Sequence, residues 1–562
     1  MLQDPGKKYS PNKLLNLPDR KWPDRVQQCP PVWCSVDMRD GNQALINPMG
    51  ASRKRRFFDL LTRMGFKEVE VGFPAASSTD YNYVRELIEE GKIPDDVTVQ
   101  VMTQARPALI QTTFEALRGV PRAIVHLYNA TAPFFRDVVF GVDRKGCIRI
   151  ATDAARAVKR QMEQYPGSRW TFQYSPETFC FTEPDFGLEI CNAVIAEFDP
   201  TPENKMILNL PTTVEVSTPN VFADHIEWFC RHIDRRDSLI ISVHPHNDRG
   251  TAVATAELAC LAGAERVEGT LFGNGERTGN VDIMTLALNL YTSGIAPGLD
   301  FSDMDTVARE VTHCNQLPVH PRHPYAGELV FTAFSGSHQD AIKKGFAARK
   351  ADPGGLWEVP YLPVDPADLG RNYEAIIRVN SQSGKGGVAY VLEQHGIVLP
   401  RELQIEFSRI VQEETERAGG EISEAQLLDS FSRTYFSDPA PYRLRSLEER
   451  KENTKAHITA SLETPGNTLM VEGTGDTLQA AFAAGCVKHG LCTEITDIPC
   501  NRTKTYGGKE IYSFVKVRSG AHDLFGAGRD RNEARAFVKA VLCAINRGIS
   551  KALLNSNIVE NQ

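Results

Sequence analysis

The chain has 562 residues, of which 41% are apolar and 24% charged, and its formal net charge is −8. These values are ordinary for globular proteins and exclude a disordered chain, and the modest acidic balance gives no general attraction to nucleic acid. With no apolar run near the ~20 residues that span a bilayer and no signal-peptide core, we expect a cytoplasmic protein with neither membrane nor nucleic-acid partners. Twelve irregularly spaced cysteines predict reduced, mostly buried thiols.

We expect an N-terminal arm over residues 1–30. Eight short β-rich runs come next, each followed by a segment with helical apolar spacing. Eight strand–helix units within about 260 residues predict a (β/α)8 TIM barrel over residues 31–325, with a doubly wound open sheet as the alternative. The predicted strands are Val32–Val36, Glu68–Val71, Thr98–Met102, Arg122–Tyr128, Trp170–Tyr174, Met206–Leu210, Leu239–Val243 and Arg266–Leu271.

Polar sequence gathers at the carboxyl ends of these runs, for example DMRDGNQ, GFPAAS, PTTVE and HPHND. The carboxyl end of a barrel carries the active site, so this clustering predicts where the chemistry lies. His244 and His246 follow the seventh run at spacing i, i+2, which places both imidazoles on one face of an extended segment. Two hydrogen-bonded histidines without a metal are the alternative. Asp40 follows the first run, and this mixed N/O set predicts a site for Zn, Mn, Co or Mg.

Arg39 precedes Asp40 and could polarise a carbonyl oxygen beside the metal, or it could form only a structural ion pair. Glu177 and Thr213 follow the fifth and sixth strands and are candidate substrate or base groups, although either could cap a helix. His126 lies inside the fourth strand and would act only if it points into the barrel mouth.

Two glycine-rich runs lie further along the chain. Phe272–Asn280 matches neither the P-loop nor the dinucleotide fingerprint in spacing. Asn380–Gly387 pairs backbone amides with Lys385, which suits a phosphate group, although a plain flexible turn explains it as well.

Beyond the barrel we expect mainly helical linker subdomains over residues 326–440 and an α+β domain over residues 441–562. The charged run 445–455 (RSLEERKENTK) indicates a boundary segment or an exposed helix. Two similar β-then-α halves follow it, which suggests an internal repeat.

Longer motifs carry a family resemblance. Residues 35–74 (SVDMRDGNQ…VEVGFP) and 243–280 (VHPHNDRG…GNGERTGN) resemble the two signatures of the α-isopropylmalate synthase and homocitrate synthase family. The motifs NLPTTVE, VPYLPVDPADLGR and VNSQSGKGGVAYVLE are similar to the longer-chain branch of that family. The resemblance covers about residues 10 to 440.

The resemblance implies a metal-dependent Claisen condensation. Acetyl-CoA would be joined to 3-methyl-2-oxobutanoate, and thioester hydrolysis would give 2-isopropylmalate, the first committed step of leucine biosynthesis. It implies that Mg²⁺, Mn²⁺ or Zn²⁺ is held by Asp40, His244, His246 and Asn280, and that catalysis uses Arg39, Glu177 and His338. It also implies that the 2-oxo acid is bound by Gln43, His126, Ser175, Thr213 and Tyr361. CoA would be bound by Ser383, Gly384, Lys385 and Gly386.

The resemblance further implies a homodimer in which the segment with His338 reaches the neighbouring subunit's active site. The C-terminal domain would bind leucine as a feedback inhibitor, near the glycine turns at Gly473, Gly475, Gly526 and Gly528; a dimerisation domain that senses nothing is the alternative. Rival functions are condensation with 2-oxoglutarate or pyruvate, a related lyase, and a catalytically dead metal-binding or regulatory protein.

Overall fold

The computed structural model describes residues 1–9, 14–333, 335–373, 385–418, 422–437, 441–452, 454–497, 511–519 and 522–559. They divide into two compact units, the first made of residues 1–330 and 364–372 and the second of residues 331–363 and 373–562. In the described part of the chain, no helix combines the length and apolar content that crossing a bilayer requires.

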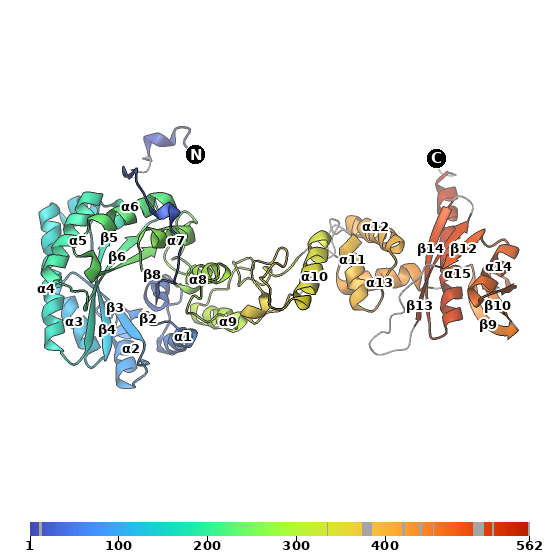
Figure 1. Cartoon of the computed structure of the whole chain (residues 1–562), viewed down its shortest axis with the longest axis horizontal. Coiled ribbons are helices and arrows are strands. Elements are labelled where there is room, and N and C mark those ends of the chain that lie inside the picture. The colour runs from blue at the N-terminus through green and yellow to red at the C-terminus, as the bar shows by residue number, and fades with distance from the viewer. Residues whose placement is uncertain are drawn as a thin grey trace. The chain divides into compact units, whose positions relative to one another are not determined.

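The first unit contains a closed barrel of eight parallel strands in chain order, which confirms the predicted TIM barrel and excludes the open sheet (Figure 1). The strands are β1 (Val32–Ser35), β2 (Glu68–Gly72), β3 (Thr98–Gln104), β4 (Arg122–Ala130), β5 (Arg169–Glu177), β6 (Met206–Thr212), β7 (Leu239–Pro245) and β8 (Arg266–Gly269). The helices that follow them are α1 (Ala51–Met64), α2 (Ser78–Glu89), α3 (Pro107–Leu117), α4 (Arg144–Gln164), α5 (Pro184–Phe198), α6 (Pro219–His232), α7 (Ala252–Ala262) and α8 (Ile283–Thr292). Helix α9 (Met304–Asn315) packs beside α1.

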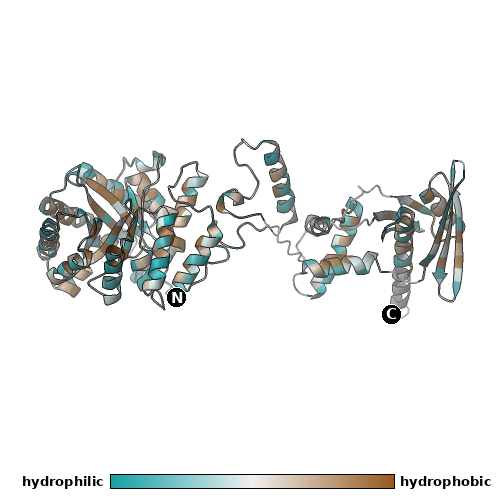
Figure 2. Ribbon diagram, turned by 90° about the horizontal axis from the view of Figure 1, so that it is seen from below, coloured by the Kyte–Doolittle hydropathy of each residue, from teal (hydrophilic) through white to brown (hydrophobic). Residues whose placement is uncertain are grey.

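Apolar side chains decide the layers of the barrel unit. Strand β6 is wholly buried and β4 almost so, as expected for strands covered on both faces. Helix α1 buries one stripe, which includes Phe57, Leu61 and Met64, and the ribbons of the barrel helices carry both hydrophobic and hydrophilic segments (Figure 2).

The N-terminal arm is attached to the outside of the barrel at α6. Arg20 donates two hydrogen bonds of 2.8 and 2.7 Å to Asp224, and the indole N–H of Trp22 donates a third of 2.8 Å to the same carboxylate. The backbone N–H groups of Lys21 and Trp22 donate to Glu227. The Trp22 side chain is buried, so this part of the arm is an ordered strap across α6.

The second unit combines helices with two three-stranded antiparallel sheets, ordered β11-β10-β9 and β12-β13-β14. Its helices are α10 (Gly336–Ala351), α11 (Lys385–Gln394), α12 (Arg401–Ala418), α13 (Glu424–Tyr435), α14 (Leu478–Lys488) and α15 (Glu533–Val559). Its strands are β9 (Arg443–Glu452), β10 (Lys455–Thr464), β11 (Asn467–Gly475), β12 (Glu494–Asp497), β13 (Ile511–Ser519) and β14 (His522–Asp530).

Two apolar clusters of the second unit meet at the sheet that contains β13. Val515 and Val517 point into a cluster shared with α14 and α15, whereas Phe514, on the opposite face, packs with Phe431 of α13 and Phe407 of α12. The helices α11–α13 and the C-terminal sheet therefore share one continuous core.

The charged run at residues 445–455 forms no helix in its described residues, so the exposed-helix alternative is wrong, whereas the boundary-segment alternative stays a prediction. Its residues form most of β9, which pairs antiparallel with β10, and Glu452 lies opposite Lys455. Most of β9 is exposed. Charges on both faces suit an edge strand, because they oppose further strand pairing while the backbone ladder to β10 supplies the hydrogen bonds.

Candidate metal centre and active site

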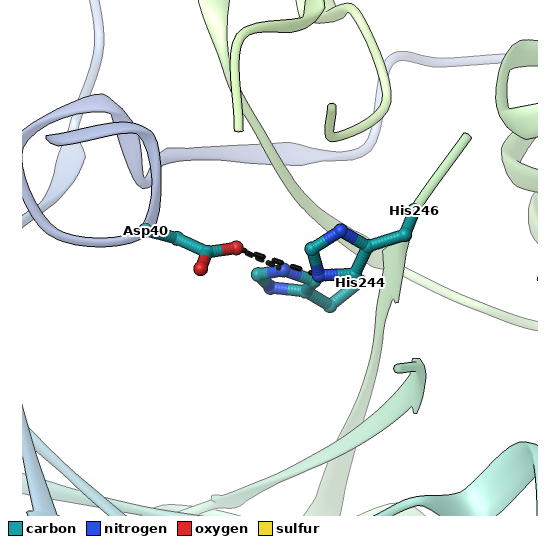
Figure 3. A group of neighbouring side chains, drawn as sticks. All are labelled: Asp40, His244 and His246. Carbon is teal, nitrogen blue, oxygen red and sulfur yellow. Dashed lines mark hydrogen bonds and ion pairs between the residues drawn. The ribbon is translucent and has the colours of Figure 1, made fainter. Parts of the chain in front are cut away.

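Three side chains converge at the carboxyl end of the barrel, where the sequence predicts a metal site (Figure 3). His244 Nε2 lies 3.0 Å from Asp40 Oδ2, and His246 Nε2 lies 3.5 Å from the same oxygen. Asn280 Oδ1 lies 3.0 Å from His244 Nε2. All four side chains are buried.

Local structure explains how these groups meet. Strand β7 extends to Pro245, two residues beyond its predicted end, so His244 is a strand residue that sits opposite Pro211 of β6. Asp40 lies on a π-helical turn, Asp37–Gly41, directly after β1. Such turns are rare and are frequent at functional sites.

The glycine-rich run Phe272–Asn280 positions Asn280. A Cβ at Gly275 would lie 2.2 Å from the Asn280 amide nitrogen, and a Cβ at Gly279 would lie 1.9 Å from the Gly273 carbonyl oxygen. Gly279 also has φ +98°, a conformation that side chains rarely adopt. These glycines therefore allow the loop to fold tightly against the Asp/His/His cluster.

The donor set fits a divalent cation. Ligand atoms at 2.0–2.2 Å from a shared ion are separated by about 3–3.5 Å, close to the spacings seen here. His246 Nδ1 is buried and has no hydrogen-bond partner among the described residues. The orientation of the His246 ring therefore depends on what its Nε2 contacts. Asp40, His244 and His246 with the Asn280 carbonyl would supply mixed N/O ligation and leave positions for a substrate.

The electrostatics of these side chains favour a bound cation. Burial opposes ionisation of Asp40, but Arg39 and His244 hold its pKa well below the ordinary value. Burial also opposes charge on His244, yet hydrogen bonds to Asp40 and Glu268 outweigh it and raise the pKa of His244 to about 9. Burial and the charge of His244 lower the pKa of His246 to about 4. A bound metal would take the place of the His244 Nε2 proton.

Arg39 connects the Asp/His/His cluster to a second carboxylate, that of Glu70. Its Nε donates a 2.6 Å hydrogen bond to Glu70 Oε2, and a terminal nitrogen lies 3.1 Å from Asp40 Oδ1. Burial opposes ionisation of Glu70, but Arg39 and a hydrogen bond from His126 keep the pKa of Glu70 below its ordinary value. The guanidinium is therefore fixed in one orientation at the cavity floor.

A cavity of about 260 Å³ opens above this floor. Burial raises the pKa of Glu177 on its wall, against the lowering effect of Arg39. The Thr213 hydroxyl accepts a 2.9 Å hydrogen bond from the backbone N–H of Thr178, which fixes the next corner of the wall. The predicted residues that line the cavity are Arg39, Asp40, Gln43, His126, Ser175, Glu177, Thr213, His244 and His246.

His126 points into the barrel mouth and lines the cavity, which is the orientation that a functional role requires. Its Nε2 lies 2.7 Å from the Ser175 hydroxyl and its Nδ1 lies 3.0 Å from Glu70. Asn209 donates a 3.1 Å hydrogen bond to the same hydroxyl. The two predicted substrate groups His126 and Ser175 are thus oriented by a buried polar network.

The carboxylates beneath the cavity floor are not among the predicted site residues. Glu70, Glu268 and Asn209 all fall inside predicted strands, where apolar patterning indicates only sheet structure. The signal was present, since acidic residues rarely lie inside fully buried strands without a partner. Each of the three has exposure of 1% or less.

Two predicted catalytic-site residues lie in the second unit. His338 of α10 and Tyr361 stack with ring centroids 3.9 Å apart, and Tyr361 has φ +65°. Of the predicted CoA-binding residues, Ser383 and Gly384 lie outside the described residues, and Lys385 and Gly386 begin α11. The roles of these residues stay predictions.

The four glycines predicted near a leucine site pack strands against helices. A Cβ at Gly473 would lie 1.8 Å from the Ala481 carbonyl oxygen of α14, and a Cβ at Gly526 would lie 2.1 Å from the Ala540 carbonyl oxygen of α15. Gly475 and Gly528 meet α14 and α15 in the same way. The two halves of the domain therefore repeat one close-packing device.

Two family models and several near full-length relatives match this chain. Residues 31–311 match the HMGL-like family, and residues 328–393 match the family described as alpha-isopropylmalate synthase, post-catalytic domain-like. A 2-isopropylmalate synthase of Azotobacter vinelandii is 55% identical over 98% of this chain and 98% of its own. One of Paraburkholderia phytofirmans is 54% identical over 100% of this chain and 97% of its own. The solved hydroxymethylglutaryl-CoA lyase of Pseudomonas aeruginosa covers 52% of this chain and 96% of its own, with 18% identity and TM-score 0.43.

The barrel and its buried Asp/His/His cluster define a metal-dependent enzyme of the HMGL-like class. Within that class, the near full-length relatives reported above are 2-isopropylmalate synthases. The chain belongs to the 2-isopropylmalate synthase family, whose members are condensing enzymes of the acyltransferase type.

Proposed function

We propose that this chain condenses acetyl-CoA with 3-methyl-2-oxobutanoate and hydrolyses the thioester, to give 2-isopropylmalate and CoA. The observation that carries the proposal is the buried Asp40–His244–His246 cluster next to Arg39, at the floor of a small cavity with Glu177 on its wall. The end-to-end similarity to 2-isopropylmalate synthases supports it.

Asp40, His244, His246 and Asn280 would hold Mg²⁺, Mn²⁺ or Zn²⁺. When bound, the ion supplies Lewis-acid polarisation of a 2-oxo acid. Arg39, fixed between Asp40 and Glu70, lines the cavity and keeps N–H donors beyond those two contacts, which would stabilise the negative charge that develops on the keto oxygen during attack. His126, Ser175, Thr213 and Gln43 would orient the rest of the acid.

The cavity wall favours a branched apolar acid. Phe73, Met102 and Pro211 contribute apolar surface. Arg39 and Arg277 supply the guanidinium groups of the described lining, and Arg277 is engaged with Asp248 at 2.7 and 3.1 Å. Since the distal carboxylate of 2-oxoglutarate would need a cation, this lining supports 3-methyl-2-oxobutanoate over 2-oxoglutarate.

Glu177 would remove the proton from the acetyl methyl group. A thioester methyl is a weak carbon acid, and burial raises the pKa of Glu177, which makes its carboxylate a stronger base. His338 and Tyr361 would complete the site from a second copy of the chain in a homodimer. The segment 383–386 would hold CoA, and leucine would bind the C-terminal domain as an inhibitor.

Release of CoA thiol tests the proposal. Purified protein is given acetyl-CoA with 3-methyl-2-oxobutanoate, pyruvate or 2-oxoglutarate, each with and without a chelator. We expect the fastest turnover with 3-methyl-2-oxobutanoate, loss with chelator, and recovery with Mg²⁺, Mn²⁺ or Zn²⁺. A faster rate with either other acid would refute the substrate, and no thiol release with any acid from folded, metal-loaded protein would refute the condensation.

A further inference from the structure

Glu268, in β8, lies one layer below the metal cluster and does not line the cavity. Its side chain is completely buried, and its carboxylate accepts five hydrogen bonds of 2.8 to 3.1 Å. Oε1 accepts from Gln100, Gln173 and Arg266, and Oε2 accepts from Asn209 and His244. A carboxylate so fully occupied cannot reorient.

The contact with His244 has a chemical consequence. Glu268 Oε2 lies 2.8 Å from His244 Nδ1, and an ionised carboxylate can only accept, so Nδ1 must carry its proton. The other ring nitrogen, Nε2, faces Asp40 and Asn280. When the ring is neutral, Nε2 is then the nitrogen with the free lone pair, and it points at the metal position.

We infer that Glu268 is the positioning residue of the metal centre, which holds His244 in the tautomer and orientation that ligate a divalent ion. The inference rests on the proposed metal site. The same carboxylate binds Asn209, which donates to the Ser175 hydroxyl, so one buried group orients both the metal side and the substrate side of the cavity.

The network also predicts what an isosteric amide would do. In Glu268→Gln, the new NH₂ cannot take the Oε1 position, because Arg266 donates there at 2.8 Å and cannot accept. Gln100 is fixed as a donor at the same position, since its own oxygen accepts from Arg266. The NH₂ must therefore take the Oε2 position and face His244 Nδ1, which would become an acceptor. Asn209, which donates to Oε2 in the native chain, would turn its carbonyl oxygen toward the NH₂, since that oxygen has no partner among the described residues. The proton would then sit on Nε2 and block ligation.

Metal titration tests this without reference to turnover. Zn²⁺ or Mn²⁺ is titrated into chelator-stripped full-length protein by calorimetry at one fixed pH, with Glu227→Gln as the matched control. Glu227 is also a buried carboxylate that accepts several hydrogen bonds, but it contacts the N-terminal strap on the outside of the barrel. We expect Glu268→Gln to weaken metal binding about 10–100-fold and Glu227→Gln to leave it unchanged.

The outcomes distinguish failure of the proposed function from failure of the positioning role of Glu268. If the native chain binds no divalent ion, the proposed function fails. If the native chain and Glu268→Gln bind the ion equally, the positioning role is overturned while the metal site stands. An equal weakening in both variants would assign the loss to general destabilisation and also overturn it.

A measurement on the native chain covers the case in which Glu268→Gln does not fold. In metal-loaded protein labelled with ¹⁵N-histidine, the His244 signals are identified by their loss in His244→Asn. We expect a protonated, strongly hydrogen-bonded Nδ1 and a metal-shifted Nε2. An unprotonated Nδ1 would overturn the inference.

Discussion

Arg39→Lys is the substitution that most directly probes the cavity floor. Arg39 makes two contacts from one rigid fork, 2.6 Å to Glu70 and 3.1 Å to Asp40, and a lysine ammonium cannot reproduce both while also facing the substrate. Loss of one charge-assisted hydrogen bond costs about 1.5–3 kcal/mol of stability. Loss of an oriented donor to a developing oxyanion costs about 2.7–4 kcal/mol in the transition state, or about 10²–10³ in kcat.

Steady-state CoA release with saturating metal and 3-methyl-2-oxobutanoate measures this effect. Arg136→Lys is the control, because Arg136 is equally buried and pairs with Glu183 at 2.8 Å outside the cavity. It should lose stability but keep kcat. Since lysine preserves the charge, metal affinity of Arg39→Lys should change less than about tenfold. A fall in kcat of less than about tenfold, equivalent to ~1.4 kcal/mol, would refute the assigned role of Arg39.

Three further predictions concern other parts of the chain. Glu177→Gln should lower kcat about 10²–10⁴-fold. Because burial raises the pKa of Glu177, the native base is protonated at acid pH, and native kcat/KM should fall as the pH decreases, starting above the ordinary carboxyl value of 4.5. The same fall in kcat/KM in the variant would contradict this role of Glu177. Asp224→Ala leaves the Trp22 indole N–H unpaired, so urea unfolding should show about 1–3 kcal/mol lower stability with kcat unchanged; an unaltered midpoint would argue against the strap. Gly526→Ala would place a Cβ 2.1 Å from the Ala540 carbonyl oxygen and should destabilise the second unit by about 1–3 kcal/mol in thermal unfolding, whereas an unchanged transition would mean that α15 shifts freely.

The barrel was predictable because its strands are apolar, short and regularly spaced. The predicted starts of all the barrel strands except β5 coincide with the observed starts, but the observed strands β3 to β7 run two or three residues further. These extensions carry polar side chains such as Ser175, Glu177 and His244, which apolar patterning assigns to loops. Inside a barrel mouth, neighbouring strands still pair there, so the ladder continues through functional residues.

The site was only partly predictable for a related reason. Residues at strand ends, such as Asp40 and His246, stand out in the sequence because their polarity interrupts an apolar run. Glu70 and Glu268 lie inside strands and have partners far along the chain; Gln100, for example, bonds to Glu268 across 168 positions. Pairings over such separations follow from barrel closure, which local patterns cannot supply.

The shared core of the second unit bears on how this chain can be shortened or recombined. Phe514 and Ala527 of the C-terminal sheet are buried in the same cluster as Leu427, Phe431 and Tyr435 of α13. A deletion that begins near residue 441 would remove these side chains and expose the apolar face of the remaining helices, which would promote aggregation. Chimeras intended to exchange regulation between relatives should therefore carry α11–α13 together with the C-terminal sheets, with the junction placed before α11.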